Sequence, residues 1–329
     1  MQRFFQIVAA SVVLAACSAN EDPGLPTLSV GIQVSPAMTL VMVAEEKGFF
    51  DEAGVDVEIE EFTAGKFALQ AFLGGSLDVA ISGEVPVTLA TLQGNEFRVI
   101  GQVVDRTVNE VRVVARRDGD VSSPNAFFTE KRRRLATSFG GGPEFYTSEF
   151  LKEFGIAPDG VELVSQRPED MPVALANGTV DAISIFDPFA AIAEARLGED
   201  AVTFKDESLY SELYVIDVRE ELLSEKRTEL ISMLTGLRSA QDFIAENPEE
   251  SKAILIEYTQ LEPEIVDAIW ENFVFEVAIN DLFIDFTTAQ AEWYISTGTA
   301  EGPVPNFRAV LYTDLLQEVD PAQVKLTGE

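Results

Sequence analysis

The chain has 329 residues, 47% of them hydrophobic, and its 23 basic and 56 acidic side chains give a net charge of −33. This charge argues against nucleic-acid binding, which depends on Lys and Arg, because the one basic cluster, at 131–134, is too short to form a groove. Histidine is absent, which excludes Ser-His-Asp and Cys-His catalysis and His-based metal sites. We therefore expect no enzyme activity, no cofactor and no metal, and an acidic surface suited to a salty, exposed environment.

The first 27 residues predict export and attachment to a membrane. Arg3 precedes a nearly continuous apolar run at 4–16, which is too short to cross a bilayer but typical of a signal peptide. The run ends in Leu14-Ala15-Ala16-Cys17, a lipobox pattern that contains the only cysteine of the chain. We expect 1–17 to be a lipoprotein signal peptide with Cys17 lipidated, and 18–27 to be a flexible tether. An ordinary signal peptide with a chance cysteine is the alternative.

Between 28 and 92, short apolar runs alternate with segments of helical periodicity. The runs predict strands at 28–34, 55–62 and 77–81, and the periodic segments predict helices at 37–50, 66–73 and 85–92. Such alternation indicates βαβ units and a mostly parallel sheet.

The middle of the chain repeats this pattern. Strands are predicted at 134–138, 161–164 and 180–186, with helices after 143, from 168 to 177 and from 188. The segments Gly75–Ile81 and Gly178–Ser184 match in pattern, each following an amphipathic helix and entering an apolar strand. The match favours two similar lobes, although junctions of this kind look alike in many α/β proteins.

The last third of the chain is predicted to be mainly helical. The expected helices are 222–245, 248–258, 263–273, 287–296 and 307–316. We interpret 111–115 and 214–218 as crossovers between lobes. Lobe I is then predicted to comprise 28–113 with 215–329, and lobe II to comprise 114–214.

Four junctions with Ser, Gly, Asp or Pro follow predicted strands, at 33–36, 82–86, 138–143 and 186–188. Ligands of open α/β sheets bind at the carboxyl ends of the strands, where helix N-termini favour anions. Each junction taken singly is at least as typical of a helix cap. The Gly140-Gly141-Gly142 run fits either a plain turn or a backbone nest for an oxyanion.

Several blocks of the chain resemble the substrate-binding proteins of nitrate/sulfonate/taurine-type ABC transporters. The blocks are 44–50 with 54–58, 74–80, 82–86, 177–182, 187–189 and 246–250. The resemblance implies an α/β, two-lobed periplasmic-binding-protein-like fold of type II with two interlobe crossovers and hinge closure over one ligand. It also implies a monomer in the periplasm or at the cell surface that contacts the membrane through its lipid anchor only and delivers its ligand to an ABC permease with an ATPase subunit.

Carried over by position, the resemblance implies a pocket lined by Ser35, Met38, Ser82, Glu84, Ser138, Gly140, Gly141 and Asp187. Two segments depart from the family pattern: Phe186-Asp187-Pro188 replaces the usual Trp-x-Pro, and 129–134 differs from the usual Asp-Leu-Lys-Gly-Lys. The expected ligand is a small organic anion or zwitterion, sulfonate-, taurine- or nitrate-like, whose amine Glu84 or Asp187 would pair. Helix capping or surface exposure explains both carboxylates equally well.

Two other functions compete with this interpretation. A same-fold enzyme of pyrimidine or chorismate metabolism is disfavoured, because a pyrimidine synthase of that type needs histidine. A pyrimidine-precursor binding protein, or a sensor that works without a permease, would keep the pocket.

Overall fold

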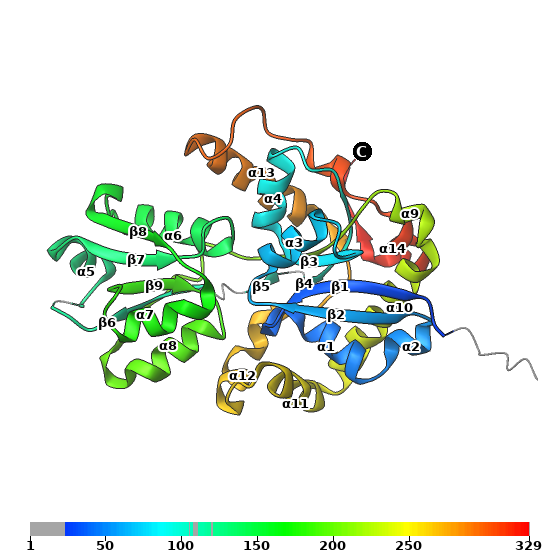
Figure 1. Cartoon of the computed structure of the whole chain (residues 1–329), viewed down its shortest axis with the longest axis horizontal. Coiled ribbons are helices and arrows are strands. Elements are labelled where there is room, and N and C mark those ends of the chain that lie inside the picture. Colours follow the sequence, from blue (N-terminus) through cyan, green and yellow to red (C-terminus); the bar gives the residue numbers. More distant parts are fainter. Residues whose placement is uncertain (1–23, 105, 108–110, 120, 329) are drawn as a thin grey trace, which may run out of the picture.

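The computed structural model describes residues 24–104, 106–107, 111–119 and 121–328. Two five-stranded sheets, each with helices on both faces, form two lobes that lie side by side (Figure 1). The first sheet, in lobe I, has the order β2 (Asp56–Phe62), β1 (Thr27–Gln33), β3 (Val79–Gly83), β11 (Tyr214–Val218) and β4 (Arg98–Val104). The second, in lobe II, has the order β10 (Ala201–Phe204), β6 (Arg112–Arg116), β9 (Ala182–Ile185), β7 (Arg133–Thr137) and β8 (Val161–Ser165). The predicted two-lobed α/β fold is confirmed.

Both sheets are mixed, where the sequence predicted mostly parallel ones. In lobe I, β1 is parallel to β2 and β3, whereas β11 is antiparallel to β3 and β4. In lobe II, β7 is parallel to β8 and β9, whereas β6 is antiparallel to β9 and β10. The reason is the connectivity: β6 and β11 are the first strands after each passage between lobes, so they enter their sheets from the edge at which the parallel strands end.

The chain passes between the lobes twice, between the end of β4 at Val104 and the start of β6 at Arg112, and between the end of β10 at Phe204 and the start of β11 at Tyr214. The prediction that 111–115 and 214–218 form the crossovers is wrong in position, because residues 112–116 form β6 and residues 214–218 form β11. Periodicity cannot distinguish a buried central strand from an apolar connection. The exact division of the chain into lobes at 113/114 and 214/215 stays a prediction.

Most predicted helices are present, with shifted ends. Lobe I contains α1 (Thr39–Glu46), α2 (Phe49–Ala53), α3 (Gly65–Leu73), α4 (Glu84–Leu92), α9 (Leu222–Glu225), α10 (Arg227–Glu246), α11 (Pro248–Thr259), α12 (Pro263–Ile269), α13 (Asp281–Ser296) and α14 (Asp314–Val319). Lobe II contains α5 (Pro124–Glu130), α6 (Gly142–Glu153), α7 (Met171–Ala176) and α8 (Phe189–Leu197). Short strands β5 (Arg106–Thr107), β12 (Phe273–Val274), β13 (Ile279–Asn280) and β14 (Val324–Lys325) and several short 3-10 helices are also present. The predicted helix at 37–50 is broken at Gly48, whose φ of 70° only glycine adopts freely.

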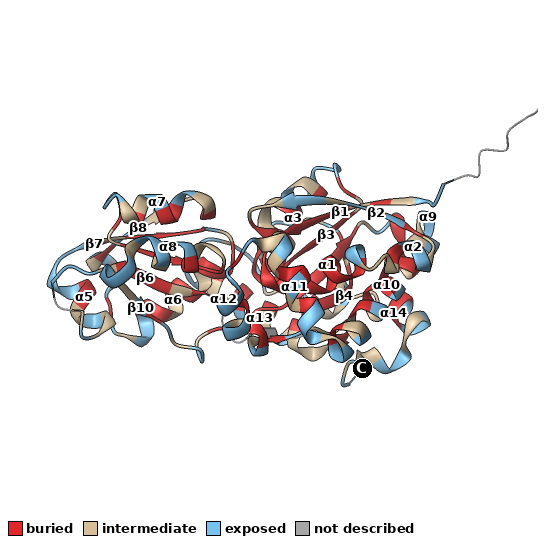
Figure 2. Ribbon diagram, turned by 90° about the horizontal axis from the view of Figure 1, so that it is seen from below, coloured by how far each residue is buried: buried red, intermediate tan, exposed pale blue. Residues whose placement is uncertain are grey.

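Both sheets are buried between helices (Figure 2), and the core around the lobe II sheet extends to Val85 and Tyr294 of lobe I. In lobe II the core is rich in aromatic rings: Tyr146 and Phe150 of α6 lie 5.9 Å apart, and Phe150 lies 4.8 Å from Phe154. These three residues form the apolar helix face that their spacing predicts. Each buried ring of this size stabilises the fold by roughly 1.5–3 kcal/mol.

The internal repeat has a structural counterpart. Asp78 accepts a hydrogen bond from the backbone N–H of Ser29 in β1, at 3.1 Å. Asp181 accepts one from the backbone N–H of Arg134 in β7, at 2.8 Å. Each aspartate, which directly precedes one strand, is therefore hydrogen-bonded to the neighbouring parallel strand, and both lobes contain this contact.

Candidate functional site

The lobes meet where β1, β2 and β3 end in lobe I and where β7 and β9 end in lobe II, and α3, α4 and α6 begin at the same place. A cavity of about 20 Å³ lies there, which we call the interlobe seam. Its twelve lining residues are Gln33, Ala64, Gly65, Lys66, Gly83, Pro86, Ser138, Gly141, Gly142, Pro143, Phe186 and Glu212. A cavity of this size holds about one water molecule. A solute of several heavy atoms can therefore enter only when the lobes move apart.

The lobe II side of the seam is the start of α6. Ser138 is 1% exposed, and its Oγ has no hydrogen-bond partner among the described residues. Gly140 has a φ of 76°, and its N–H donates to Oε2 of Glu144 at 2.7 Å. Gly141 is the N-cap of α6. The Gly140 N–H is thus engaged by the first turn of α6, and the Ser138 hydroxyl is the unused side-chain polar group that a predicted site residue presents at the seam.

The lobe I side is organised by Gln33. Its Nε2 donates to Oγ of Ser35 at 2.8 Å and to the hydroxyl of Tyr214 at 2.9 Å, while its Oε1 accepts from the N–H of Gly65 at 2.8 Å. Ser35 is fully buried behind Gln33. The amide of Gln33 therefore fixes the start of α3 relative to β1 and β11.

Two other predicted site residues of lobe I lie below the seam surface. Ser82 is buried and donates to Oδ2 of Asp217 in β11 at 2.8 Å. Met38 is buried in the hydrophobic core of lobe I. Neither residue lines the seam in this structure, although the neighbour of Ser82, Gly83, does.

Glu84 begins α4 and is completely buried. Its carboxylate accepts hydrogen bonds from the hydroxyl of Tyr210 at 3.0 Å, the N–H of Leu213 at 2.8 Å and Nε2 of Gln290 at 2.6 Å. Burial raises the pKa of Glu84 to about 7, although these three donors oppose the shift. Because Tyr210 and Leu213 belong to the second crossover, Glu84 attaches this crossover to lobe I.

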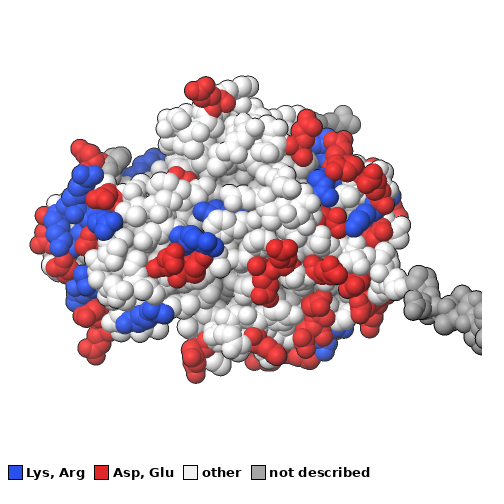
Figure 3. All heavy atoms as spheres, in the orientation of Figure 1, with Lys and Arg blue, Asp and Glu red and all other residues white. Residues whose placement is uncertain are grey.

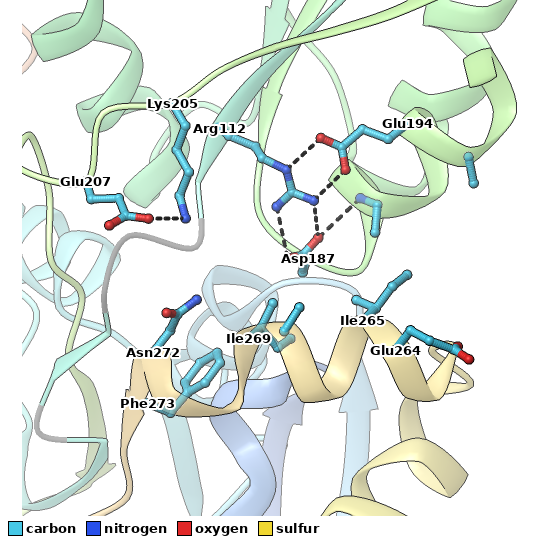
Figure 4. Close-up of a pocket in the computed structure, with 13 residues that line it drawn as sticks. Arg112, Asp187, Glu194, Lys205, Glu207, Glu264, Ile265, Ile269, Asn272 and Phe273 are labelled. Atoms are coloured by element: carbon cyan, nitrogen blue, oxygen red, sulfur yellow. Dashed lines mark hydrogen bonds and ion pairs between the residues drawn. The ribbon is translucent and has the colours of Figure 1, made fainter. Parts of the chain in front are cut away.

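Asp187 lies at a different place between the lobes. Its carboxylate forms two 2.9 Å hydrogen bonds with the guanidinium of Arg112, which also binds Glu194 (Figure 4). A cavity of about 570 Å³ opens below this cluster, with α8 on one side and Ile265 and Ile269 of α12 on the other. We call it the α8–α12 cavity. Asp187 is therefore neutralised by an internal arginine, and it does not line the seam.

Two charged residues at the seam were not predicted from the sequence. Nζ of Lys66, at the start of α3, donates to the backbone oxygen of Phe139 across the lobes at 2.7 Å, and burial lowers the pKa of Lys66. Glu212, in the second crossover, is 5% exposed and accepts from the hydroxyl of Tyr214 at 3.1 Å. The Gly65-Lys66 helix start resembles the four junctions that the sequence predicted as ligand-binding, so the same signal identifies it. Glu212 lies in an irregular segment, which carries no such signal.

Further contacts hold the lobes together beside the seam. Nε1 of Trp293, in α13, donates to Oγ of Ser148 in α6 at 3.0 Å. The ring of Phe145, in α6, packs edge-on against Trp293 at 5.3 Å and against Tyr210 at 5.6 Å. The structure therefore shows the lobes in close contact along α6.

Of the eight predicted ligand-binding residues, Ser138 and Gly141 line the seam, and whether any of the eight contacts a solute stays a prediction. Within the described ranges, His, Cys, Asp and Glu form no group that could hold a metal ion. In the same part of the chain, every helix is too short or too polar to cross a membrane. Cys17 and the predicted signal peptide lie outside the described residues.

The model of the NMT1/THI5-like family matches residues 35–251, which include both sides of the seam and both crossovers. The chain belongs to this family. The resemblance predicted from the sequence blocks is thereby confirmed at the level of the family.

Curated relatives of this family member include binding proteins of different specificity. A Bacillus subtilis protein, provisionally named for aliphatic sulfonates binding, is 25% identical over 277 residues, which cover 81% of each chain. The formylaminopyrimidine-binding protein of Halalkalibacterium halodurans is 24% identical over 277 residues, covering 77% of this chain and 78% of its own.

Solved structures show the same fold. The alkanesulfonate-binding protein SsuA of Xanthomonas axonopodis pv. citri, bound to MOPS, superposes with a TM-score of 0.73 at 18% identity, over 88% of this chain and 99% of its own. The periplasmic nitrate-binding protein NrtA of Synechocystis PCC 6803 gives a TM-score of 0.70 at 16% identity, over 91% and 89% of the two chains. This NMT1/THI5-like chain therefore has the fold of periplasmic solute-binding proteins.

Proposed function

We propose that the protein is the solute-binding component of a bacterial ABC importer and that it captures a small organic anion or zwitterion between its lobes. In this proposal it is lipid-anchored outside the cytoplasm through Cys17 and delivers its solute to a permease that works with an ATPase subunit. Family membership, the names of the relatives and the two-lobed fold support this role. It is proposed to act by binding rather than by catalysis.

The observation that carries the proposal is the unused hydroxyl of Ser138 at the N-terminus of α6. A buried hydroxyl without a partner costs about 1–3 kcal/mol, so an acceptor on a solute would gain from binding there. The positive end of α6 favours an oxyanion at the same place. The ammonium of Lys66 lines the same seam. A sulfonate, carboxylate or nitrate oxygen fits this set of donors.

Thermal-shift screening of the purified protein tests the proposal. The panel contains ethanesulfonate, taurine, nitrate and an aminopyrimidine, because a solute that binds only the folded state stabilises it, by about 2.7 kcal/mol at 100 times its Kd. We expect at least one anion or zwitterion to raise the unfolding midpoint, and Ser138→Ala to reduce that shift. Ser224→Ala, at an exposed position of α9, serves as the control. If none of these compounds shifts the wild-type midpoint, the proposed solute class is wrong.

A pyrimidine-precursor binding protein is the second candidate. Phe186 is 5% exposed and lines the seam, where its ring could stack on a flat heterocycle. The name of the Halalkalibacterium halodurans relative supports this possibility. A midpoint shift with the aminopyrimidine alone, abolished by Phe186→Leu, would favour it over an aliphatic anion.

A further inference from the structure

The α8–α12 cavity lies beside both crossovers. Arg112, which lines it, begins β6 directly after the first crossover, and Phe273 of β12 pairs with Thr107 of β5 in that crossover. Lys205 and Glu207 line it from the start of the second crossover. Its volume of about 570 Å³ falls within the usual range for small-molecule sites, about 300–1,000 Å³. Among the described residues, none lines both this cavity and the seam, so the two are separate places for a ligand.

One wall of the cavity is apolar. Ile265 and Ile269 lie one turn apart on α12 and are half-buried, and the ring of Phe273 follows them along the same wall (Figure 4). Ala195 of α8 lines the cavity from the other side. A ligand with an apolar body would remove these half-exposed side chains from water, which favours its binding.

Above this wall, one guanidinium is shared between two carboxylates. Arg112 donates two hydrogen bonds of 2.9 Å to Asp187 and two, of 3.0 and 2.9 Å, to Glu194. Burial alone would raise the pKa of Glu194, but the hydrogen bonds from Arg112 outweigh burial and hold this pKa below its usual value. Glu194 is therefore ionised at neutral pH. Because one guanidinium neutralises one carboxylate, the cluster keeps an excess negative charge.

The other charged groups of the cavity add to this excess. Lys205 is paired with Glu207 at 2.8 Å, and Glu264, in the first turn of α12, is exposed. The described lining residues include four carboxylates and two basic side chains, a net charge of −2. Within the described part of the chain, Oε2 of Glu194 accepts one hydrogen bond, whereas a carboxylate oxygen can accept two. The Glu194 side chain is 30% exposed, so this acceptor is open to a cationic group.

We propose that the α8–α12 cavity is a second ligand site, which takes a small organic cation with an apolar body, such as an amidinium or ammonium group on a ring. The cationic group pairs with Glu194, and the apolar body packs against Ile265 and Ile269. The net charge of the cavity repels anions, so its ligand belongs to a different class from the solute proposed for the seam. The inference goes beyond the proposed function and does not depend on it.

Three matched compounds test this inference on the unmodified protein. Isothermal titration calorimetry measures the Kd of benzamidine, which is protonated at neutral pH, of benzamide, which has a similar shape but no charge, and of guanidinium, which has the charge but no ring. The titrations are run at physiological ionic strength, where a screening length of about 8 Å limits attraction by the acidic surface as a whole. We expect benzamidine to bind at least tenfold more tightly than either of the others, a difference of about 1.4 kcal/mol.

The other outcomes each overturn the inference. If benzamide binds as tightly as benzamidine, the charge of the cavity is not used. If guanidinium does, the apolar wall is not used and the acidic surface alone attracts the cation. If benzamidine does not bind, the cavity does not take this class of ligand. None of these results bears on the solute of the seam.

Variants assign the binding to this cavity. Ala195→Lys places an ammonium group at an exposed position of α8 that lines the cavity, and we expect it to raise the Kd of benzamidine at least tenfold, or about 1.4 kcal/mol. Ala195→Gln, which adds a neutral side chain, should raise it less. Ala253→Lys, at an exposed position of α11, adds the same charge outside the cavity and should leave the Kd unchanged.

A second pair of variants separates the cavity from the seam. Glu264→Gln, at an exposed position, removes one negative charge from the cavity and should weaken benzamidine binding, whereas Ser138→Ala at the seam should not change it. A wild-type Kd in Ala195→Lys, or a raised Kd in Ser138→Ala, would mean that benzamidine binds elsewhere and would overturn the inference. Unfolding midpoints without ligand show whether each variant folds, and Glu264→Gln together with the three compounds decides if Ala195→Lys does not.

Discussion

Glu84 is a buried carboxyl group whose protonation contributes to the stability of the fold. The residue occupies the first turn of α4, where the helix dipole favours a negative charge. Burial is the larger effect, and it raises the pKa of Glu84 to about 7. The folded protein therefore holds a proton on Glu84 in a pH range in which the unfolded chain, with a carboxyl pKa of 4.5, has lost it.

The first consequence concerns the pH dependence of the unfolding free energy. Because the folded-state pKa of Glu84 is the higher one, the stability contributed by its protonation is fully present below pH 4.5 and is lost as pH rises through 7. In Glu84→Gln this loss is absent. We expect the unfolding free energy of the wild type, relative to that of the variant, to fall between pH 5 and 7 with a slope of up to about 1.4 kcal/mol per pH unit.

Urea unfolding at pH 5, 6, 7 and 8 provides this measurement. Glu271→Gln, at an exposed position, is the control and should follow the wild type at every pH. A difference between wild type and Glu84→Gln that stays constant with pH would contradict a raised pKa in the folded state.

Some residues of the candidate site were predictable from the sequence, and others were not. Ser138 and Gly141 were predictable because they follow an apolar strand with turn-forming residues, so their place at a strand end was visible in the chain. Lys66 begins a helix that its periodicity predicts, but the sequence does not show that this helix start faces the other lobe, and Glu212 reaches the seam from an irregular segment with no periodicity of its own. Asp187 was correctly placed at a strand end, but its partner Arg112, 75 residues away, turns it toward another cavity.

At the scale of elements, the start of α6 determines how closely the lobes can approach. A Cβ atom at Gly142 would lie 2.6 Å from the hydroxyl of Tyr210 and 2.9 Å from Oε1 of Glu212. Tyr210 cannot easily give way, because it is buried and donates to Glu84. The absence of a side chain at this one position is therefore a condition for the contact between α6 and the second crossover.

We accordingly expect Gly142→Ala to hold the lobes apart. Small-angle X-ray scattering should show a larger radius of gyration for the variant than for the wild type, and the Kd for any solute that stabilises the wild type should rise at least tenfold, about 1.4 kcal/mol. The unfolding midpoint should change little, since alanine is tolerated in the first turn of a helix.

Gly160→Ala is the matched control, because a Cβ atom there meets nothing within 4 Å and the residue does not have a positive φ. If Gly142→Ala has the wild-type radius of gyration and affinity, then the seam accommodates a methyl group and the contact at α6 does not limit closure.

The elements themselves were largely predictable from periodicity. Alternating patterns predicted β2, and helical spacing predicted α3, α4 and α6 to within a few residues. The strand β4 was missed, and β11 was assigned to a crossover instead of a central strand. Strand order depends on contacts between distant segments, and a short apolar run is compatible with several positions in a sheet. The sequence therefore predicted the class of the fold better than its sheet order.

At the scale of the whole molecule, the negative charge is unevenly distributed. Residues 112–204 contain 10 basic and 15 acidic side chains, so this part carries −5 and the rest of the chain carries −28. On the face shown in Figure 3, Lys and Arg gather at the far end of lobe II, whereas Asp and Glu dominate lobe I. Lobe I is therefore the part in which like charges repel one another most.

This distribution predicts that salt stabilises the protein at neutral pH. Two effects oppose each other, because salt screens the repulsion among the acidic groups of lobe I and also weakens exposed ion pairs such as Lys47–Glu250 and Arg227–Glu318. Exposed pairs contribute only about 0–1 kcal/mol each, while each unpaired acidic group interacts with many others. Raising NaCl from 10 mM to 1 M shortens the screening length from about 30 to about 3 Å, so we expect the unfolding midpoint to rise by several degrees.

Calorimetry across this range of salt, at pH 7.5 and at pH 5, provides the test. At pH 5, closer to the isoelectric point of about 4.2, a larger share of the carboxylates is protonated, so the same increase in salt should raise the midpoint less. A midpoint that falls with NaCl at pH 7.5 would mean that ion pairs outweigh the repulsion. Equal increases at both pH values would assign the effect to the strengthening of hydrophobic burial by salt, which does not depend on the charge of the protein.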